Sequence, residues 1–132
     1  MEKFKVKDYW YSKFNGLKLN FDYPFIKKVR SDEKQLLFKK ATIQLNKNST
    51  DKLLALSKNS DLGLYILMLT GLKITLSKYT EQSEIIVGIT PLNGNNLQNI
   101  LPIKSDVKSK ALVRDYINIL KSELGKDLNF QI

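Results

Sequence analysis

The sequence predicts an α+β domain, an α/β sandwich in which helices pack against a mixed sheet, and three observations lead to this fold class. The chain has 132 residues, the length of one domain, and 42% of them are hydrophobic, which is enough for a core. Residues 61–79 and 110–124 carry apolar residues at helical spacing. Along residues 37–45, mostly apolar positions alternate with mostly polar ones, which is the period of a half-buried strand. Residues 84–90 form a short apolar run rich in β-branched residues, which is also typical of a strand.

The first expected element is a short aromatic helix over residues 8–14. Tyr11 and Phe14 recur three positions apart, and Trp10 completes the apolar flank. Asn15-Gly16 follows directly and is a typical stop signal for a helix. The sequence therefore predicts that the helix ends at this pair.

The chain reads as one partial domain with three parts. Residues 1–35 hold the aromatic helix and an irregular crossing segment, where Pro24 lacks a backbone donor and a polar run has little to bury. Residues 36–125 form the core, and residues 126–132 form a tail. No internal repeat is visible in the sequence.

The core begins with the strand over residues 37–45, followed by a helix that starts at the polar residues 48–51. The longest helix, residues 61–79, is apolar on a wide stripe, so we expect it to be buried on more than one side. Gly71 in its middle predicts a close packing contact. The stripe consists of Leu62, Ile66, Leu69, Leu72, Leu76 and Tyr79.

Two strands and a helix complete the core. Residues 84–90 read as a central strand covered on both faces, and residues 100–107 as an edge strand, because Pro102 near its start cannot donate a ladder bond. The amphipathic helix over residues 110–124 ends with Gly125 as its C-cap. Its expected inward residues are Leu112, Val113, Tyr116, Ile117, Leu120 and Leu124.

Composition excludes several kinds of chemistry. The chain has neither cysteine nor histidine, so it offers no disulfide, no thiolate or imidazole metal ligand, and no cysteine–histidine or serine–histidine nucleophile pair. We therefore expect a chain that is not an enzyme, with no catalytic residue, no metal and no cofactor. No secretory signal or membrane-spanning run is seen, and together with the lack of cysteine this predicts a cytoplasmic protein.

The net charge is +9, and lysine carries nearly all of it, because Arg30 and Arg114 are the only arginines. The lysines alternate with apolar residues instead of forming a block. Such a pattern is typical of a solvated face, and the alternative is an electrostatic surface for an anionic partner. The pairs Lys27-Lys28 and Lys39-Lys40 would serve such a partner.

Several motifs between residues 9 and 124 follow one another in a familiar order. Tyr9-Trp10 with Phe14-Asn15-Gly16 is similar to "YW…L-x-G", residues 49–57 to "L-T-x-x-L-x-x-L-A", residues 81–91 to "G-Q-x-D-I-V-V-G-T-P" and residues 99–104 to "V-N-T-L-P-L-R". Together they resemble the C-terminal lobe of the condensation domains of nonribosomal peptide synthetases. The resemblance implies part of a chloramphenicol-acetyltransferase-like fold and a role in secondary metabolism.

Departures from this family also carry meaning. The family's "H-H-x-x-x-D-G" motif belongs to an N-terminal lobe that this chain lacks, and no histidine replaces it. The loop between Asn96 and Asn99 is shortened to Leu97-Gln98. The resemblance thus implies a trimmed condensation domain that has lost the acyl-transfer site, and we expect an adaptation to a non-catalytic role.

The expected function is docking or scaffolding in a peptide synthetase. The resemblance implies packing against an adenylation domain, or docking of a partner subunit or carrier protein, and a basic surface would steer an acidic carrier protein. The expected partner-binding residues are Tyr9, Tyr11, Phe14, Lys27 and Lys28, because aromatic residues dominate interface hot spots. The alternative for the four aromatic residues is internal packing, and Trp10 and Phe14 favour it most; the four are Tyr9, Trp10, Tyr11 and Phe14.

Three further possibilities remain open from the sequence. A lobe cut from a larger sandwich exposes sheet faces and edges, which predicts self-association or obligate partnering. A nucleic-acid-binding domain would use the lysine pairs and the N-terminal aromatic residues, although near-absence of arginine speaks against it. A residual acyltransferase would need a lysine or carboxylate, and the acidic pair Asp32-Glu33 lies in the polar crossing segment.

Overall fold

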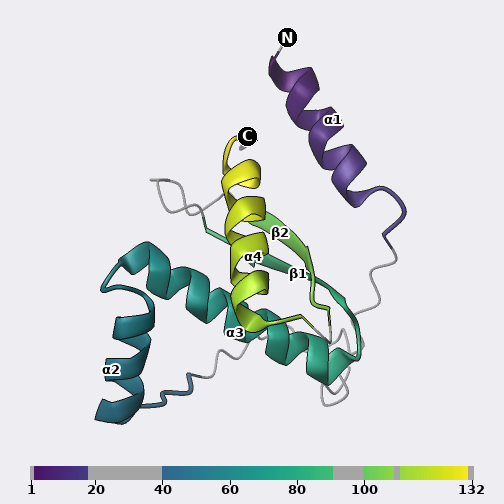
Figure 1. Cartoon of the computed structure of the whole chain (residues 1–132). Helices are drawn as coiled ribbons and strands as arrows, with labels where there is room; N and C mark the ends of the chain where they lie inside the picture. Colours follow the sequence, from purple (N-terminus) through teal and green to yellow (C-terminus); the bar gives the residue numbers. More distant parts are fainter. Residues whose placement is uncertain (1, 18–39, 91–99, 109–110, 131–132) are drawn as a thin grey trace.

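The computed structural model of the chain describes residues 2–17, 40–90, 100–108 and 111–130 (Figure 1). In these ranges the chain forms helices and a two-stranded antiparallel sheet, so the predicted combination of helices packed against a sheet is confirmed. In chain order the elements are α1 (Glu2–Phe14), α2 (Lys47–Leu56), α3 (Asp61–Thr80), β1 (Glu84–Ile89), β2 (Leu101–Asp106) and α4 (Val113–Leu128).

The sheet is a hairpin with one buried face. Ile85 pairs with Ser105, Val87 with Ile103 and Ile89 with Leu101, so these side chains share a face. α3 packs on β1 and α4 on β2, and both helices contribute to the core on that face. The buried cluster consists of Ile66, Leu69, Ile89, Leu101, Ile103, Leu120 and Leu124.

None of the described helices covers the opposite face of the sheet, which corrects the prediction of a strand covered on both faces. Glu84 and Gly88 are exposed on this side of β1, and Asp106 is exposed on β2. Lys104 Nζ lies 2.9 Å from a carboxylate oxygen of Glu84 across the hairpin. The prediction failed because the apolar run in β1 includes Ile86, which is half-buried on this face although no helix in the described ranges packs over it.

α3 buries a narrower stripe than the sequence predicts. Its buried residues are Ile66, Leu69, Thr70 and Lys73, while Leu72 and Tyr79 are exposed. The expected burial on several sides is therefore wrong for the described part of the chain. The sheet and α4 cover one side of α3, and its flank beyond β1 has no described element against it.

Two local features of α3 differ from the prediction. An added Cβ at Gly71 would meet nothing within 4 Å, so the expected close contact there is wrong. The close contact lies at Gly63, where a Cβ would approach the Ser57 carbonyl oxygen to 2.5 Å. Gly63 lies in the first turn of α3. The turn at Lys58 and Asn59, both with positive φ, precedes this helix and brings α2 back against α3.

The predicted strand over residues 37–45 is wrong where the structure describes it. Residues 40–46 have no regular structure and are exposed, and residues 37–39 lie outside the described ranges. Helix α2 follows with Asn46 as its N-cap, whose side chain accepts a hydrogen bond from the Ser49 amide at 2.8 Å. Alternation fitted a strand, but pairing requires a neighbouring strand, which the described residues do not supply.

α1 and α4 are both longer than predicted. α1 ends at Phe14, followed by Gly16 at φ 78°, so the Asn15-Gly16 stop is confirmed. α4 runs through Gly125 to Leu128 and has its C-cap at Asn129, because exposed Gly125 keeps a helical conformation. Among the described residues, no helix is both long and apolar enough to cross a membrane.

Candidate interaction site

Helix α1 is attached to the C-terminal end of α4 by side chains. Tyr9 donates its phenolic hydrogen to Asp127 Oδ1 at 2.5 Å, and Trp10 Nε1 donates to the Phe130 carbonyl at 2.9 Å. The Tyr9 ring stacks on the Phe130 ring at 4.0 Å between centroids. The first and last described segments of the chain therefore pack against each other through these contacts.

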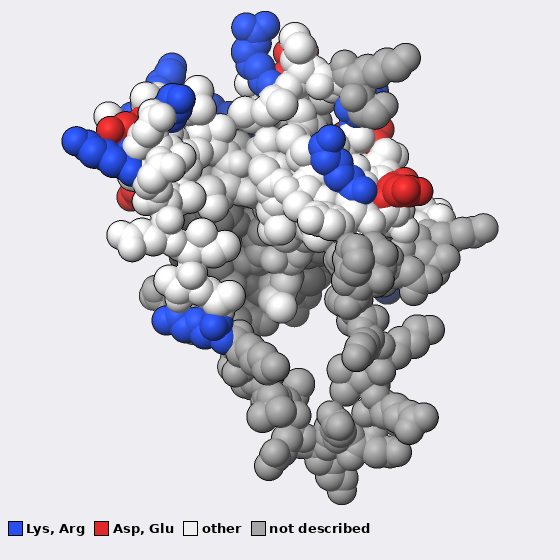
Figure 2. Space-filling model, turned by 90° about the horizontal axis from the view of Figure 1, so that it is seen from below, with Lys and Arg blue, Asp and Glu red and all other residues white. Residues whose placement is uncertain are grey.

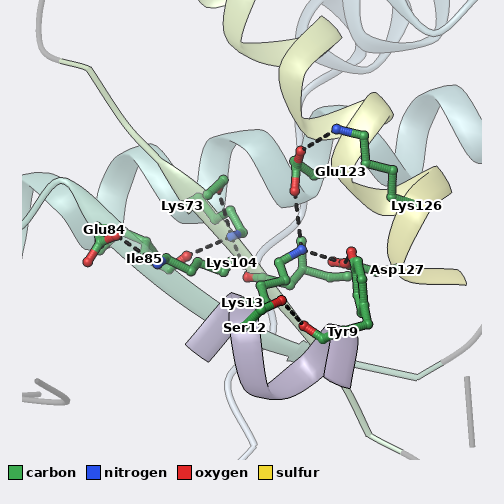
Figure 3. Close-up of polar contacts among 12 residues, drawn as sticks. Tyr9, Ser12, Lys13, Lys73, Glu84, Ile85, Lys104, Glu123, Lys126 and Asp127 are labelled. Carbon is green, nitrogen blue, oxygen red and sulfur yellow. Dashed lines mark hydrogen bonds and ion pairs between the residues drawn. The ribbon is translucent and has the colours of Figure 1, made fainter. Parts of the chain in front are cut away.

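Lys13 adds an ionic contact to this attachment (Figure 3). Its ammonium group contacts Asp127 Oδ1 and lies 3.2 Å from Glu123 Oε2. Asp127 is fully buried, and its second oxygen, Oδ2, has no hydrogen-bond partner among the described residues. A buried carboxylate depends on its cation, because an unpaired buried charge is costly.

The pKa values of the surrounding groups follow from this arrangement. Burial raises the pKa of Tyr9, and its hydrogen bond to Asp127 acts in the same direction, so Tyr9 stays a neutral donor. Burial also raises the pKa of Glu123, but hydrogen bonds from Lys126 and Lys13 outweigh it and leave the pKa lowered. At the contact between α1 and α4, the carboxylates of Glu123 and Asp127 are thus both paired with lysine side chains.

The predicted partner-binding aromatic residues lie on different sides of α1. Tyr9 faces α4, and Phe14 stacks on Trp10 with 5.7 Å between ring centroids. Tyr11 points the other way and is 70% exposed. Lys27 and Lys28 lie outside the described residues, so the structure does not place them beside Tyr11.

The outer face of α1, formed by Lys7, Asp8 and Tyr11, is exposed throughout. At 100° per residue these positions fall on one side of the helix, opposite the attachment residues. A large aromatic ring here is presented on a helix that is already held in place. Such an arrangement can bind another protein with little ordering of its own backbone.

Lys73 is a second polar feature, and sequence reasoning missed it (Figure 3). It is fully buried, and its Nζ donates to the carbonyl oxygens of Ile85 at 2.8 Å and Ile103 at 2.7 Å and to Ser105 Oγ at 2.9 Å. All three ammonium hydrogens therefore have acceptors on the hairpin. Ser105 in turn shares a hydrogen bond of 2.7 Å with the Tyr116 hydroxyl.

This contact ties α3 to both strands, and it affects protonation. Burial lowers the pKa of Lys73 to about 7; the cation of Lys13 acts in the same direction, and Asp127 opposes both. The signal in the sequence was a lysine at the centre of the apolar helix, four positions after Leu69. Because Lys73 has no exposed surface, its role is structural.

Other surface features are less specific. An open hollow of about 800 Å³ lies between the end of α3 and the start of α4, lined by Ile74, Tyr116 and mixed charges such as Lys78 and Asp106. Figure 2 shows one face of the molecule, on which basic side chains lie in several places and acidic side chains lie beside some of them. In the described part of the chain, no group of acidic residues could hold a metal ion.

Comparison with known proteins finds similarity to three bacterial synthases. The chain is 34% identical over 92% of its length to bacitracin synthase 2 of Bacillus licheniformis, 30% identical over 89% to bacitracin synthase 1 of the same species, and 31% identical over 91% to surfactin synthase subunit 1 of Bacillus subtilis. It spans 5%, 2% and 4% of these proteins, respectively. No family model matches the chain, and no solved structure matches it.

These matches support the peptide-synthetase resemblance and correct one prediction. The chain is similar to a short segment of each synthase, and the matches do not test which domain type that segment is. The expectation of a chain that is not an enzyme is contradicted, because the proteins it matches are synthases. Lack of histidine and cysteine in a segment this short does not decide whether the protein is an enzyme, and no residue here is shown to be catalytic.

Proposed function

We propose that this chain is a condensation-type segment of a nonribosomal peptide synthetase that docks a neighbouring part of the synthetase through the outer face of α1. Similarity to segments of three synthases over about nine-tenths of the chain supports the assignment to this class. The exposed position of Tyr11 on an attached helix supports the docking role.

The exposure of Tyr11 is the observation that carries the proposal. Large aromatic side chains contribute most to protein interfaces when their surroundings are already ordered. Trp10 and Lys13 hold the inner side of α1 against α4, so Tyr11 is presented by a fixed helix. A tyrosine used for internal packing would instead be buried against the core.

The charge of the chain favours an acidic partner. A net charge of +9 steers association with negatively charged proteins and disfavours basic ones. We therefore propose a carrier protein of a peptide synthetase as the partner, since the resemblance implies that carrier proteins are acidic. An adenylation domain packing on the same face is the competing outcome.

Calorimetric titration with a carrier protein and with an adenylation domain from the same synthetase tests this proposal. We expect binding to the carrier protein, and Tyr11→Ala to weaken it by about tenfold or more, the effect typical of losing an interface aromatic. Ile119→Ala, at an exposed apolar position on α4, is the matched control and should leave the affinity unchanged.

The two titrations also separate the alternatives. Binding to the adenylation domain alone, with the same sensitivity to Tyr11→Ala, would replace the carrier protein as the partner while keeping the docking face. Equal affinities for the wild type and Tyr11→Ala would exclude the outer face of α1 as the docking surface.

A further inference from the structure

Strand β1 has a free edge, which follows from the hairpin register. The Val107 amide donates to the carbonyl of Ser83 at 2.7 Å, so these opposite residues form a hydrogen-bonded pair. Hydrogen-bonded and non-hydrogen-bonded pairs alternate along an antiparallel ladder. The backbone N–H and C=O groups of Glu84, Ile86 and Gly88 therefore point away from β2, and no third strand pairs with them among the described residues.

The outer edge of β2 is different. Pro102 lies at an outward-pointing position of the ladder and has no N–H to offer, and Lys104 follows two residues later. Proline and lysine are features that protect a strand edge against pairing. β1 carries neither, so the hairpin has one protected and one open edge.

An apolar flank of α3 lies on the side of the open edge. Tyr65, Leu72 and Leu76 fall on one side of the helix at 100° per residue, about a quarter turn from its buried residues, and Leu72 is 46% exposed. Ile74 lies on the other side, where it lines the hollow together with Tyr116 of α4. Because α3 packs on β1 and α4 on β2, the flank projects past β1, and a strand added at the open edge would lie beneath it.

The chain also contains an unpaired segment that fits this edge. Residues 40–46 are exposed without regular structure, with Ile43 87% exposed. Ala41, Ile43 and Leu45 alternate with polar residues, so in an extended conformation they would all face one side. Lys40 and Lys47 flank the segment, while two acidic residues, Glu81 and Glu84, flank the start of β1.

We propose that residues 40–46 of one copy pair with the open edge of β1 in a second copy of this chain, and that the exchange is reciprocal. Each copy has an unpaired donor segment and an unpaired acceptor edge, so two copies satisfy each other and the assembly closes as a two-fold dimer. Ala41, Ile43 and Leu45 then lie against the apolar flank of the partner's α3. This inference is independent of the docking face on α1.

Analytical ultracentrifugation over a wide range of concentration tests the exchange. We expect the wild type to sediment as a dimer at high concentration and Ile43→Lys to raise the dimer dissociation constant by about a hundredfold, because each dimer loses two buried isoleucine side chains. Ile43 makes no core contact in the single chain, so this variant should fold normally. Ile119→Lys makes the same change at an exposed isoleucine of α4 and should leave the dimer intact.

A substitution in the acceptor edge of β1 gives a second test of the exchange. Ile86→Pro removes an outward N–H without removing a ladder hydrogen bond and should abolish the homodimer. A mixture of Ile43→Lys and Ile86→Pro keeps one intact donor and one intact acceptor, so it should form a heterodimer that neither variant forms alone.

Two results would overturn the exchange. One is a wild-type chain that remains monomeric at every concentration. The other is a dimer that responds equally to Ile43→Lys and Ile119→Lys, which would place its interface elsewhere. Tyr11→Ala should not affect the dimer, so a failure of the docking proposal is distinguishable from a failure of this one.

Discussion

Lys73 lies fully buried between α3 and the hairpin, and Lys73→Met tests what its burial does to stability. Methionine has a similar length but neither charge nor donors. The substitution removes three hydrogen bonds, to two backbone carbonyls and to Ser105, and it also removes a desolvated ammonium group. Ser105 keeps its hydrogen bond to Tyr116, so the variant leaves that hydroxyl with a partner.

The effect depends on pH in a defined direction. Burial lowers the pKa of Lys73 from 10.5 to about 7, so the folded chain binds fewer protons than the unfolded chain between these values. The free energy of unfolding therefore rises with pH in this window, by up to about 1.4 kcal/mol per pH unit from this group. Below the folded pKa the contribution is constant and unfavourable, at about 5 kcal/mol.

Urea unfolding of the wild type and Lys73→Met at several values between pH 7 and 9 measures this contribution. We expect the free energy of the wild type to rise by about 2 kcal/mol relative to the variant over that range. Lys78→Met is the matched control, since Lys78 is an exposed lysine on the same helix and should leave the pH dependence unchanged. Parallel pH profiles for the wild type and Lys73→Met would refute the reasoning.

Two further predictions concern α1 and the glycines of α3. Lys13→Met removes a cation from the buried carboxylate of Asp127, so we expect the free energy of unfolding to fall by about 3 kcal/mol and the fluorescence of Trp10, the single tryptophan, to shift to the red. An unshifted emission maximum would contradict the ionic attachment. Thermal unfolding should show Gly71→Ala stabilised by about 0.5–1 kcal/mol, because the position is helical and open. Gly63→Ala should be destabilised, because its Cβ would lie 2.5 Å from a backbone oxygen; equal shifts would contradict this contrast.

Periodicity predicted the elements that are stabilised mainly by local interactions. The apolar spacing in α3 and α4 and the β-branched run in β1 placed helices and a strand at the right positions. The N-cap of α3 is Ser60, whose side chain accepts a hydrogen bond from the Gly63 amide at 3.3 Å. The strand expected over residues 37–45 failed, because its alternation specifies a face but not a partner.

The candidate site was only partly predictable for the same reason. An aromatic helix was evident, yet its inward and outward residues depend on where α4 ends, and α4 extends beyond the predicted stop at Gly125. Asp127, which accepts a hydrogen bond from Tyr9 and forms an ion pair with Lys13, lies in that extension. The separation of Tyr11 from Tyr9 therefore required the tertiary structure.

The sequence by itself determined the positions of the helices and of the two strands and the basic charge of this protein, because these depend on spacing, capping and composition within a few residues. Only the tertiary structure decided which polar groups are buried. Lys73 bonds to acceptors at Ile85, Ile103 and Ser105, up to 32 positions away. Tyr9 bonds to Asp127 across 118 positions. A buried charge is stable only when packing brings such distant partners to it, and that information is not contained in any local pattern.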